Sequence, residues 1–326
     1  MPNKGTIRGT HHLTFCVGEA QEDYDFHVRL LGLKSVKKTV LFDGEIPIYH
    51  LYYGNREGDA STLLTSFPYR QAGWMGKRGT NQLKTLMLSI PADAVGFWVD
   101  RFNEKGVEHE VVTRFGKERV CFAHPCGIPY ELVGVDDDFR TPYESHGVVA
   151  DAAIRGAYGT TCSVREPDLQ AFFITEGMGG AQTGSEGKHH EFTIGTDEGN
   201  GRILELVEEP ELPQGSWTFG EGTIHHQAFD VHDADNQQVV KDWLVGLGFT
   251  DVSESKDRGY FFSMYMRSPG GALCELAWST EAGFTIDESV EELGTHMCIP
   301  PHWEDRRSEI SSLEPIETDE VVHSGA

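Results

Sequence analysis

Two stretches of the chain that lie far apart are similar to each other. Residues 9–17 read Gly-Thr-His-His-Leu-Thr-Phe-Cys-Val, and residues 222–231 read Gly-Thr-Ile-His-His-Gln-Ala-Phe-Asp-Val. Both are short strand candidates, and each precedes an amphipathic stretch, at residues 23–31 and 234–247, that closes on a glycine as helices commonly do. An internal repeat of this kind constrains the fold more than any other feature, because each copy must form the same supersecondary unit.

The repeated unit continues with strands after its helix. Residues 46–53 and 260–267 are rich in β-branched and aromatic side chains, which is typical of strands. The unit is therefore β-α-β-β-β. Two eroded copies begin at residues 83–88 and 159–164, which gives four modules in two halves and predicts an α+β fold with curved, mixed sheets.

The ends of the modules suggest where the halves divide. Modules two and four both end as strand, Pro-Gly turn and strand, with an acidic residue, Glu131 or Glu275, in the last strand. We expect an N-terminal domain at 7–138 (modules one and two), a polar linker at 139–152, a C-terminal domain at 153–280 (modules three and four) and an acidic extension at 281–326.

Composition excludes several classes of function. A length of 326 residues suits two domains, and a formal charge of −25 opposes binding to nucleic acid or anionic lipid. No apolar run reaches the roughly 18 residues that a membrane span needs. The six cysteines are scattered without a CxxC pair, and the first ten residues carry no apolar signal segment, so we expect reduced thiols and a cytoplasmic location.

The two histidine pairs carry the chemistry. Adjacent strand residues point to opposite faces, so His11 is expected on an apolar face with Leu13, and His12 on a smaller, mixed face with Thr14. The same argument selects His226 over its neighbour. With Glu275 these two imidazoles complete a facial triad, which suits Fe(II) because it leaves coordination positions open. We therefore predict a cupped metal site at His12, His226 and Glu275.

Other histidines are assigned structural roles. A single strand histidine is more often structural than a ligand, whereas a pair repeated at equivalent positions is less easily accidental. The eroded modules place Leu, Thr or both where the histidines would be, so Glu131 and Glu205 lack imidazole partners and one metal site per chain is expected. His189-His190 is interpreted as a loop or edge strand. Four others stay structural or merely nearby: His50, His124, His296 and His302.

Several further short sequence segments support a resemblance to one known family. The histidine pairs and the glutamate on four β-α-β-β-β modules resemble the vicinal-oxygen-chelate (glyoxalase-like) superfamily. Within it, the chain looks like the type I extradiol-like dioxygenases that cleave hydroquinone and 2,6-dichlorohydroquinone, a likeness that runs over nearly the whole chain. The segments that show this likeness are residues 20–23, 36–40, 46–52, 215–218 and 258–261.

This resemblance implies a site and a reaction. Fe(II), or alternatively Mn(II), would be held by His12, His226 and Glu275. Substrate and protons would be handled by five surrounding residues: His11, Thr14, His225, Arg258 and Tyr265. The partners implied are a small aromatic diol and O₂, with a homo-oligomer left open. One phenolate oxygen would bind the metal, and oxygen would insert beside the carbon that carries it.

Two alternatives share the fold, because fold alone does not decide function. A glyoxalase-type isomerase would be expected to present two or more carboxylates among four protein ligands, whereas this chain offers one convincing glutamate. A metal-free binding protein would bind its ligand equally well after His12→Ala. The substituents of the ring, whether hydrogen, methyl or chlorine, are left open.

Overall fold

The four predicted modules are present in the computed structural model, which describes residues 4–41, 44–196 and 201–319. Each module consists of one strand, a helical segment and three further strands. Module one comprises β1 (Gly9–Val17), α1 (Ala20–Tyr24), the π-helix η1 (Asp25–Leu30), β2 (Lys34–Val40), β3 (Tyr49–Gly54) and β4 (Leu63–Pro68). Module two comprises β5 (Gln82–Pro91), η2 (Ala92–Ala94), α2 (Val95–Lys105), β6 (Glu110–Arg114), β7 (Lys117–Ala123) and β8 (Pro129–Val135).

The second half repeats this order. Module three comprises β9 (Gly156–Val164), α3 (Asp168–Phe172), the π-helix η3 (Phe173–Gly177), β10 (Ala181–Glu186), β11 (His189–Thr193) and β12 (Ile203–Glu208). Module four comprises β13 (Thr223–Asp230), α4 (Ala234–Gly246), β14 (Lys256–Asp257), β15 (Phe261–Arg267) and β16 (Leu273–Ser279). Three short helices follow: η4 (Gly283–Ile286), η5 (Pro301–Arg306) and α5 (Arg307–Ile310). The α+β fold of four β-α-β-β-β modules predicted from the repeat is confirmed.

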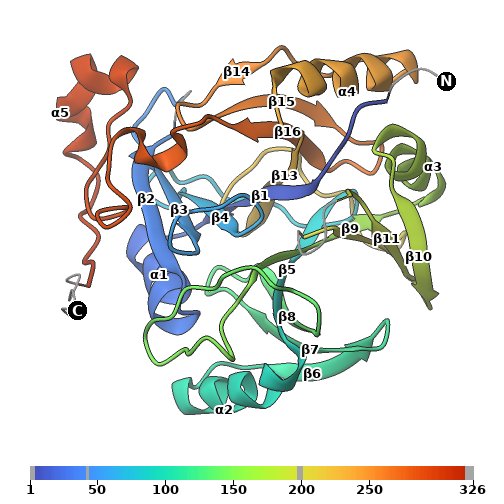
Figure 1. The fold of residues 1–326 in the computed structure, drawn as a ribbon, viewed down its shortest axis with the longest axis horizontal. Helices are drawn as coiled ribbons and strands as arrows, with labels where there is room; N and C mark the ends of the chain where they lie inside the picture. Colours follow the sequence, from blue (N-terminus) through green and yellow to red (C-terminus); the bar gives the residue numbers. More distant parts are fainter. Residues whose placement is uncertain (1–3, 42–43, 197–200, 320–326) are drawn as a thin grey trace.

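The modules combine across the halves to form two sheets. One eight-stranded sheet has the order β14-β15-β16-β13-β1-β4-β3-β2, and the other has the order β10-β11-β12-β9-β5-β8-β7-β6. Modules one and four therefore share the first sheet, and modules two and three share the second (Figure 1). The domain boundaries expected near residues 138, 152 and 280 stay predictions, but each sheet draws one module from each predicted half.

Some expected element boundaries shift. The first helix begins at Ala20 and passes into η1 before ending at Leu30, so it is longer than the predicted 23–31. The strand expected from residue 46 begins at Tyr49. Pro47 lies before that start. Because proline has no backbone N–H, its position outside the strand costs the sheet no hydrogen bond.

The core joins the two sheets. Leu13 and Phe15 of β1 belong to the same buried cluster as Leu86 and Leu88 of β5, and all four are at most 1% exposed. Since side chains alternate along a strand, these leave the other face of β1 to His12 and Thr14. One face of the central strands thus builds the core, and the other lines the concave side of the first sheet.

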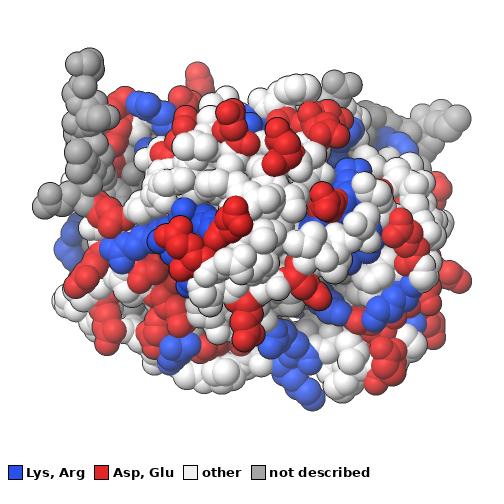
Figure 2. All heavy atoms as spheres, turned by 90° about the horizontal axis from the view of Figure 1, so that it is seen from below, with Lys and Arg blue, Asp and Glu red and all other residues white. Residues whose placement is uncertain are grey.

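Charged side chains of both signs are spread over the face of the molecule seen in Figure 2. Within the described residues, no helix is both long and apolar enough to cross a membrane.

Candidate metal centre and substrate pocket

The three predicted ligands lie on three neighbouring strands. His12 of β1 is paired with Ala228 of β13, and Ala228 is paired with Glu275 of β16. His226 lies two residues before Ala228, on the same face of β13. The pairing of modules one and four in one sheet is what brings these side chains together.

Their donor atoms converge. His226 Nε2 lies 2.8 Å from Glu275 Oε2 and 3.1 Å from His12 Nε2, and the distance from His12 Nε2 to Glu275 Oε2 is 3.6 Å. Donors about 2.1 Å from one cation would stand about 3.0 Å apart in adjacent octahedral positions. These separations therefore fit a single divalent ion.

The state of Glu275 supports this fit. Its side chain is completely buried, Oε1 accepts a hydrogen bond from Ser263 Oγ, and Oε2 faces the Nε2 atoms of His226 and His12. A buried carboxylate needs compensating positive charge, and a cation between the two imidazoles would supply it. The residues present thus suit a metal.

The first histidine of each pair contacts the second. His11 Nδ1 lies 2.9 Å from His12 Nδ1, and His225 Nδ1 lies 2.8 Å from His226 Nδ1. His11 Nε2 also lies 2.8 Å from Ser279 Oγ. Because the Nδ1 atoms are engaged, the Nε2 atoms of His12 and His226 are the ones directed at Glu275.

Two β-bulges explain this contact. In the β1–β13 ladder, Thr10 and His12 pair with consecutive residues of β13, so no residue of β13 lies opposite His11. At the second bulge, no residue of β1 lies opposite His225. The expectation that His11 points away from His12 was wrong in this respect. A bulged residue breaks the strict alternation, and its side chain can turn toward its neighbour.

A cavity of about 360 Å³ opens onto the three predicted ligands. Of the other predicted site residues, His225, Arg258 and Tyr265 line it, whereas His11 and Thr14 lie behind the ligands. The remaining lining is largely aromatic or aliphatic, which suits a planar apolar ring. Aromatic residues in this lining include Tyr52, Phe67, Tyr69, Tyr260 and Phe261.

Tyr265 and Arg258 form one unit in the cavity wall. Tyr265 is paired with Glu275 across β15 and β16, and Arg258 Nε donates a hydrogen bond to Tyr265 Oη at 3.2 Å. Burial, together with the nearby Glu275, raises the pKa of Tyr265. The phenol thus stays protonated at neutral pH and can donate a hydrogen bond.

Thr14 lies beneath the predicted ligands. It is completely buried on β1 between His12 and Cys16, and its Oγ1 lies 2.7 Å from Thr65 Oγ1 on β4. Thr65 in turn lies 3.2 Å from His50 Nε2. Thr14 thus belongs to a polar chain that reaches the cavity wall through His50.

Sequence reasoning missed His50 and Tyr52 as cavity residues. Both line the cavity, and Tyr52 Oη lies 2.9 Å from His50 Nδ1. Burial, followed by the charge of His12, holds the pKa of His50 well below its ordinary value. Their spacing of two within a single strand, which places both on one face, is the signal that could have found them.

His189 and His190 lie outside this centre. They begin β11, which has β10 on one side and β12 on the other, so the expectation of a loop or edge strand was wrong. His190 Nε2 pairs with Glu208 at 2.7 Å. Neither residue lines the cavity.

The second sheet holds arginines at the corresponding place. Glu131 of β8 and Glu205 of β12 flank Arg119, whose Nη1 lies 2.8 Å from Glu131 Oε2 and 2.6 Å from Glu205 Oε1. Arg114 contacts both carboxylates as well. Guanidinium groups thus take the position of a cation in this sheet.

Comparison with known proteins places the chain in a family. No protein-family model matches it. It is 38% identical over 308 residues to a chlorohydroquinone/hydroquinone 1,2-dioxygenase of Sphingobium indicum, covering 93% of this chain and 95% of that protein. It is 33% identical over 314 residues to MhqO of Bacillus subtilis, provisionally named a ring-cleaving dioxygenase, with 96% and 98% coverage.

Solved structures agree. A crystal structure from Bacillus subtilis, provisionally described as a dioxygenase, superposes with a TM-score of 0.89 at 33% identity, covering 98% of this chain and 100% of that one. Glyoxalase I from Zea mays has a TM-score of 0.62 at 16% identity, covering 88% and 97%, which shows the shared fold. The chain therefore belongs to the family of aromatic ring-cleaving dioxygenases, and its fold is glyoxalase-like.

Proposed function

We propose that this protein is an Fe(II)-dependent dioxygenase that cleaves hydroquinone or a substituted hydroquinone between a hydroxylated carbon and its neighbour, inserting both atoms of O₂. The observation that carries the proposal is the convergence of two imidazoles and one carboxylate in a cavity lined largely by aromatic side chains. The relative that is 38% identical and named for hydroquinone 1,2-cleavage supports the choice of substrate class.

His12, His226 and Glu275 would hold the ion. When bound, Fe(II) supplies open coordination positions for a phenolate oxygen and for O₂, and it lowers the pKa of the phenol. Mn(II) suits the same ligand set. A para-diol can place only one of its oxygens at a single metal, so the other must be recognised by protein groups.

Side chains of the cavity would perform the remaining tasks. The Tyr265 phenol and the Arg258 guanidinium, already hydrogen-bonded to each other, are suited to orient substrate oxygens and to stabilise negative charge that develops on them. His225 lines the cavity and can move a proton at its ring nitrogens.

His11 and Thr14 have less direct roles in this proposal. His11 holds the ring of His12 from behind, and Thr14 connects the ligand strand to the His50 chain. The aromatic side chains of the cavity wall provide apolar contact for the faces of the substrate.

The experiment is oxygen uptake by metal-loaded protein. The protein would be loaded with Fe(II) or Mn(II) without air, mixed with hydroquinone and its methyl or chloro derivatives, and exposed to isotopically heavy O₂. We expect consumption of one O₂ per ring and both heavy atoms in the ring-opened product. Glu275→Ala should lose both metal and uptake. Full metal occupancy without oxygen consumption for any para-diol would refute the proposal.

An isomerase of the glyoxalase type receives less support. Among the described residues that line the cavity, Glu275 is the one carboxylate. The likeness to glyoxalase I, at 16% identity, concerns the fold alone.

A further inference from the structure

The segment that follows the last module covers the edge of the first sheet. β2 is the outer strand of this sheet, and Met297 forms a parallel bridge with Lys38 of β2. Cys298 N–H donates to the Lys38 carbonyl at 2.9 Å, and Lys38 Nζ donates to the Thr295 carbonyl at 3.1 Å. The segment from 281 to 319 runs beside β2 in Figure 1, so it covers part of an edge that would otherwise be open.

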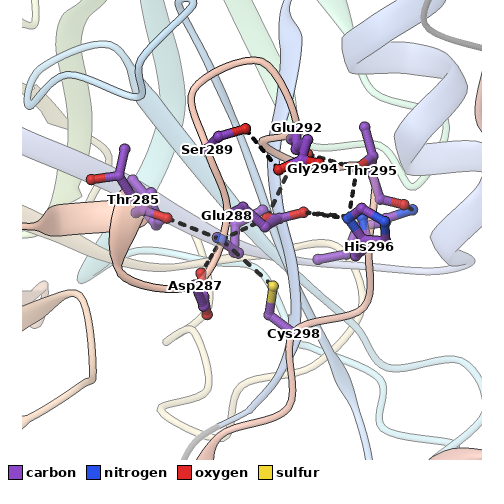
Figure 3. A network of polar contacts seen from close by, with 12 residues as sticks. Thr285, Asp287, Glu288, Ser289, Glu292, Gly294, Thr295, His296 and Cys298 are labelled. Atoms are coloured by element: carbon purple, nitrogen blue, oxygen red, sulfur yellow. Dashed lines mark hydrogen bonds and ion pairs between the residues drawn. The ribbon is translucent and has the colours of Figure 1, made fainter.

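A buried lysine holds this segment. Lys37 is completely buried, and its Nζ donates to Asp287 Oδ1 at 2.5 Å, to Glu288 Oε2 at 2.6 Å and to the Phe284 carbonyl at 3.1 Å. In Figure 3 the side chains of Asp287, Glu288 and Cys298 converge on one point, which is this ammonium group. We call the group formed by Lys37, Asp287 and Glu288 the Lys37 anchor.

The anchor is charged. Burial alone would lower the pKa of Lys37, but the hydrogen bonds to Asp287 and Glu288 outweigh burial and raise it. Glu288 also accepts hydrogen bonds from the backbone N–H groups of His296 and Gly294, at 3.0 and 3.3 Å. If the segment moved away, a buried cation would be left without partners, so the anchor keeps the segment in place.

The anchor reaches the substrate cavity through Asp287. While Oδ1 of this residue binds Lys37, its Oδ2 accepts a hydrogen bond from Tyr260 Oη at 2.9 Å. The Tyr260 ring lines the cavity and packs against Phe284 of the segment, with ring centroids 4.9 Å apart. Pro300, from the same segment, also lines the cavity.

One wall of the cavity is thus built jointly by module four and the segment. Tyr260 comes from the module, whereas Phe284, which packs against the Tyr260 ring, and Pro300, which also lines the cavity, come from the segment. None of these three residues is one of the predicted ligands or substrate-handling groups. They shape the space that a substituted ring would occupy.

We propose that Asp287 is a positioning residue for ring cleavage: held by Lys37, it fixes Tyr260 in the cavity wall and thereby sets how tightly the substrate ring binds. This inference rests on the proposed function. It makes the segment from 281 to 319 part of the active site. A purely structural anchor would instead affect unfolding and leave substrate binding unchanged.

The test is a double-mutant cycle of Tyr260→Phe and Asp287→Ala in the full-length, metal-loaded protein. Tyr260→Phe keeps the ring and removes only the hydroxyl. Loss of a hydrogen bond to a charged group predicts that each single variant raises KM for hydroquinone about tenfold with kcat changed little. The double variant should be no worse than the worse single variant, because both remove the same contact.

The control is Glu291→Ala. Glu291 is a carboxylate of the same segment that pairs with Arg56 at 3.6 Å on the surface, and it does not line the cavity. Its KM should match that of the unaltered protein. If Asp287→Ala fails to fold, Tyr260→Phe alone decides, since it leaves Asp287 bound to Lys37.

Two results separate the possible failures. An unchanged KM in Tyr260→Phe, with a lowered unfolding midpoint, would overturn the positioning role while the dioxygenase activity stands. Hydroquinone affinity measured by calorimetry without air gives a second readout. If the unaltered protein binds hydroquinone but consumes no O₂, the proposed function is wrong. In that case, a Kd for hydroquinone that is unchanged in both single variants would overturn the positioning role as well.

Discussion

The two histidines of each His-His pair make different contacts in this site. His12 and His226 point their Nε2 atoms at Glu275, whereas His11 and His225 contact them through Nδ1. The difference arises from two bulges and not from the residue type. The position of each histidine in the β1–β13 ladder therefore decides which one could coordinate a metal ion.

A substitution at His11 separates these roles. His11→Ala removes the group that orients His12 but leaves all three predicted ligands in place. We expect metal affinity to fall by about 10–100-fold, as is usual for such outer contacts, whereas His12→Ala should abolish binding. Metal titration by calorimetry measures both, with His190→Ala as the control. Equal losses for His11→Ala and His12→Ala would contradict the assignment.

At the scale of elements, α1 is joined to three strands or turns by one carboxylate. Asp23 is completely buried and accepts hydrogen bonds from Tyr53 Oη at 2.7 Å and Ser66 Oγ at 2.5 Å. His27 Nδ1 and His124 Nε2 lie 3.1 and 3.3 Å from its other oxygen. The helix of module one is thereby fixed to its own sheet and to the β7–β8 turn of module two.

This carboxylate predicts a pH dependence of stability. Burial would raise the pKa of Asp23, but His27 and the hydrogen bonds of the two histidines outweigh burial and lower it. A lowered pKa in the folded state stabilises the protein above the unfolded value of about 3.9, and this contribution is lost as the pH falls toward the folded value.

Asp23→Asn is the matching variant. Replacing a charged acceptor by a neutral one should cost about 1.5–3 kcal/mol at neutral pH, and the difference from the unaltered protein should shrink below about pH 4. Urea unfolding across this range measures both quantities. A difference that stays constant down to pH 3 would show that Asp23 is not the group responsible.

At the scale of the whole molecule, the two sheets share one architecture but gather different side chains on it. The first sheet gathers two imidazoles and a glutamate that suit a metal, whereas the second gathers Glu131 and Glu205 around Arg119. Burial would lower the pKa of Arg119, but Glu205 and Glu131 outweigh it and raise it. An arginine of the chain itself thus supplies the positive charge in the second sheet.

Arg119→Met tests this role. The substitution keeps most of the side-chain volume but leaves two buried carboxylates that Arg114 alone must neutralise. We expect a loss of about 3–5 kcal/mol in the free energy of unfolding with metal content unchanged. Denaturant titration checks the first expectation and metal analysis the second. Lys105→Met, at an exposed position of α2, should cost little.

Much of this architecture could be predicted because a repeated structural unit is visible as similar segments in the sequence. The similarity of residues 9–17 and 222–231 identified both the module and the strands of the predicted histidine ligands, and the glutamate of module four completed the predicted set. His50 and Tyr260 were not predicted as wall residues. Their place depends on how β3 and the 281–319 segment pack against module four, which no local pattern records.

The sequence by itself determined the β-α-β-β-β unit, its four copies and the residues suited to hold a metal, because hydrophobic periodicity and side-chain chemistry are local properties. Only the tertiary structure decided that modules one and four share a sheet and that bulges turn His11 and His225 toward their neighbours. It also decided that Lys37 ties the C-terminal segment to the cavity. The reason is physical: pairing between distant strands and burial of charge depend on contacts that form only when remote parts of the chain meet.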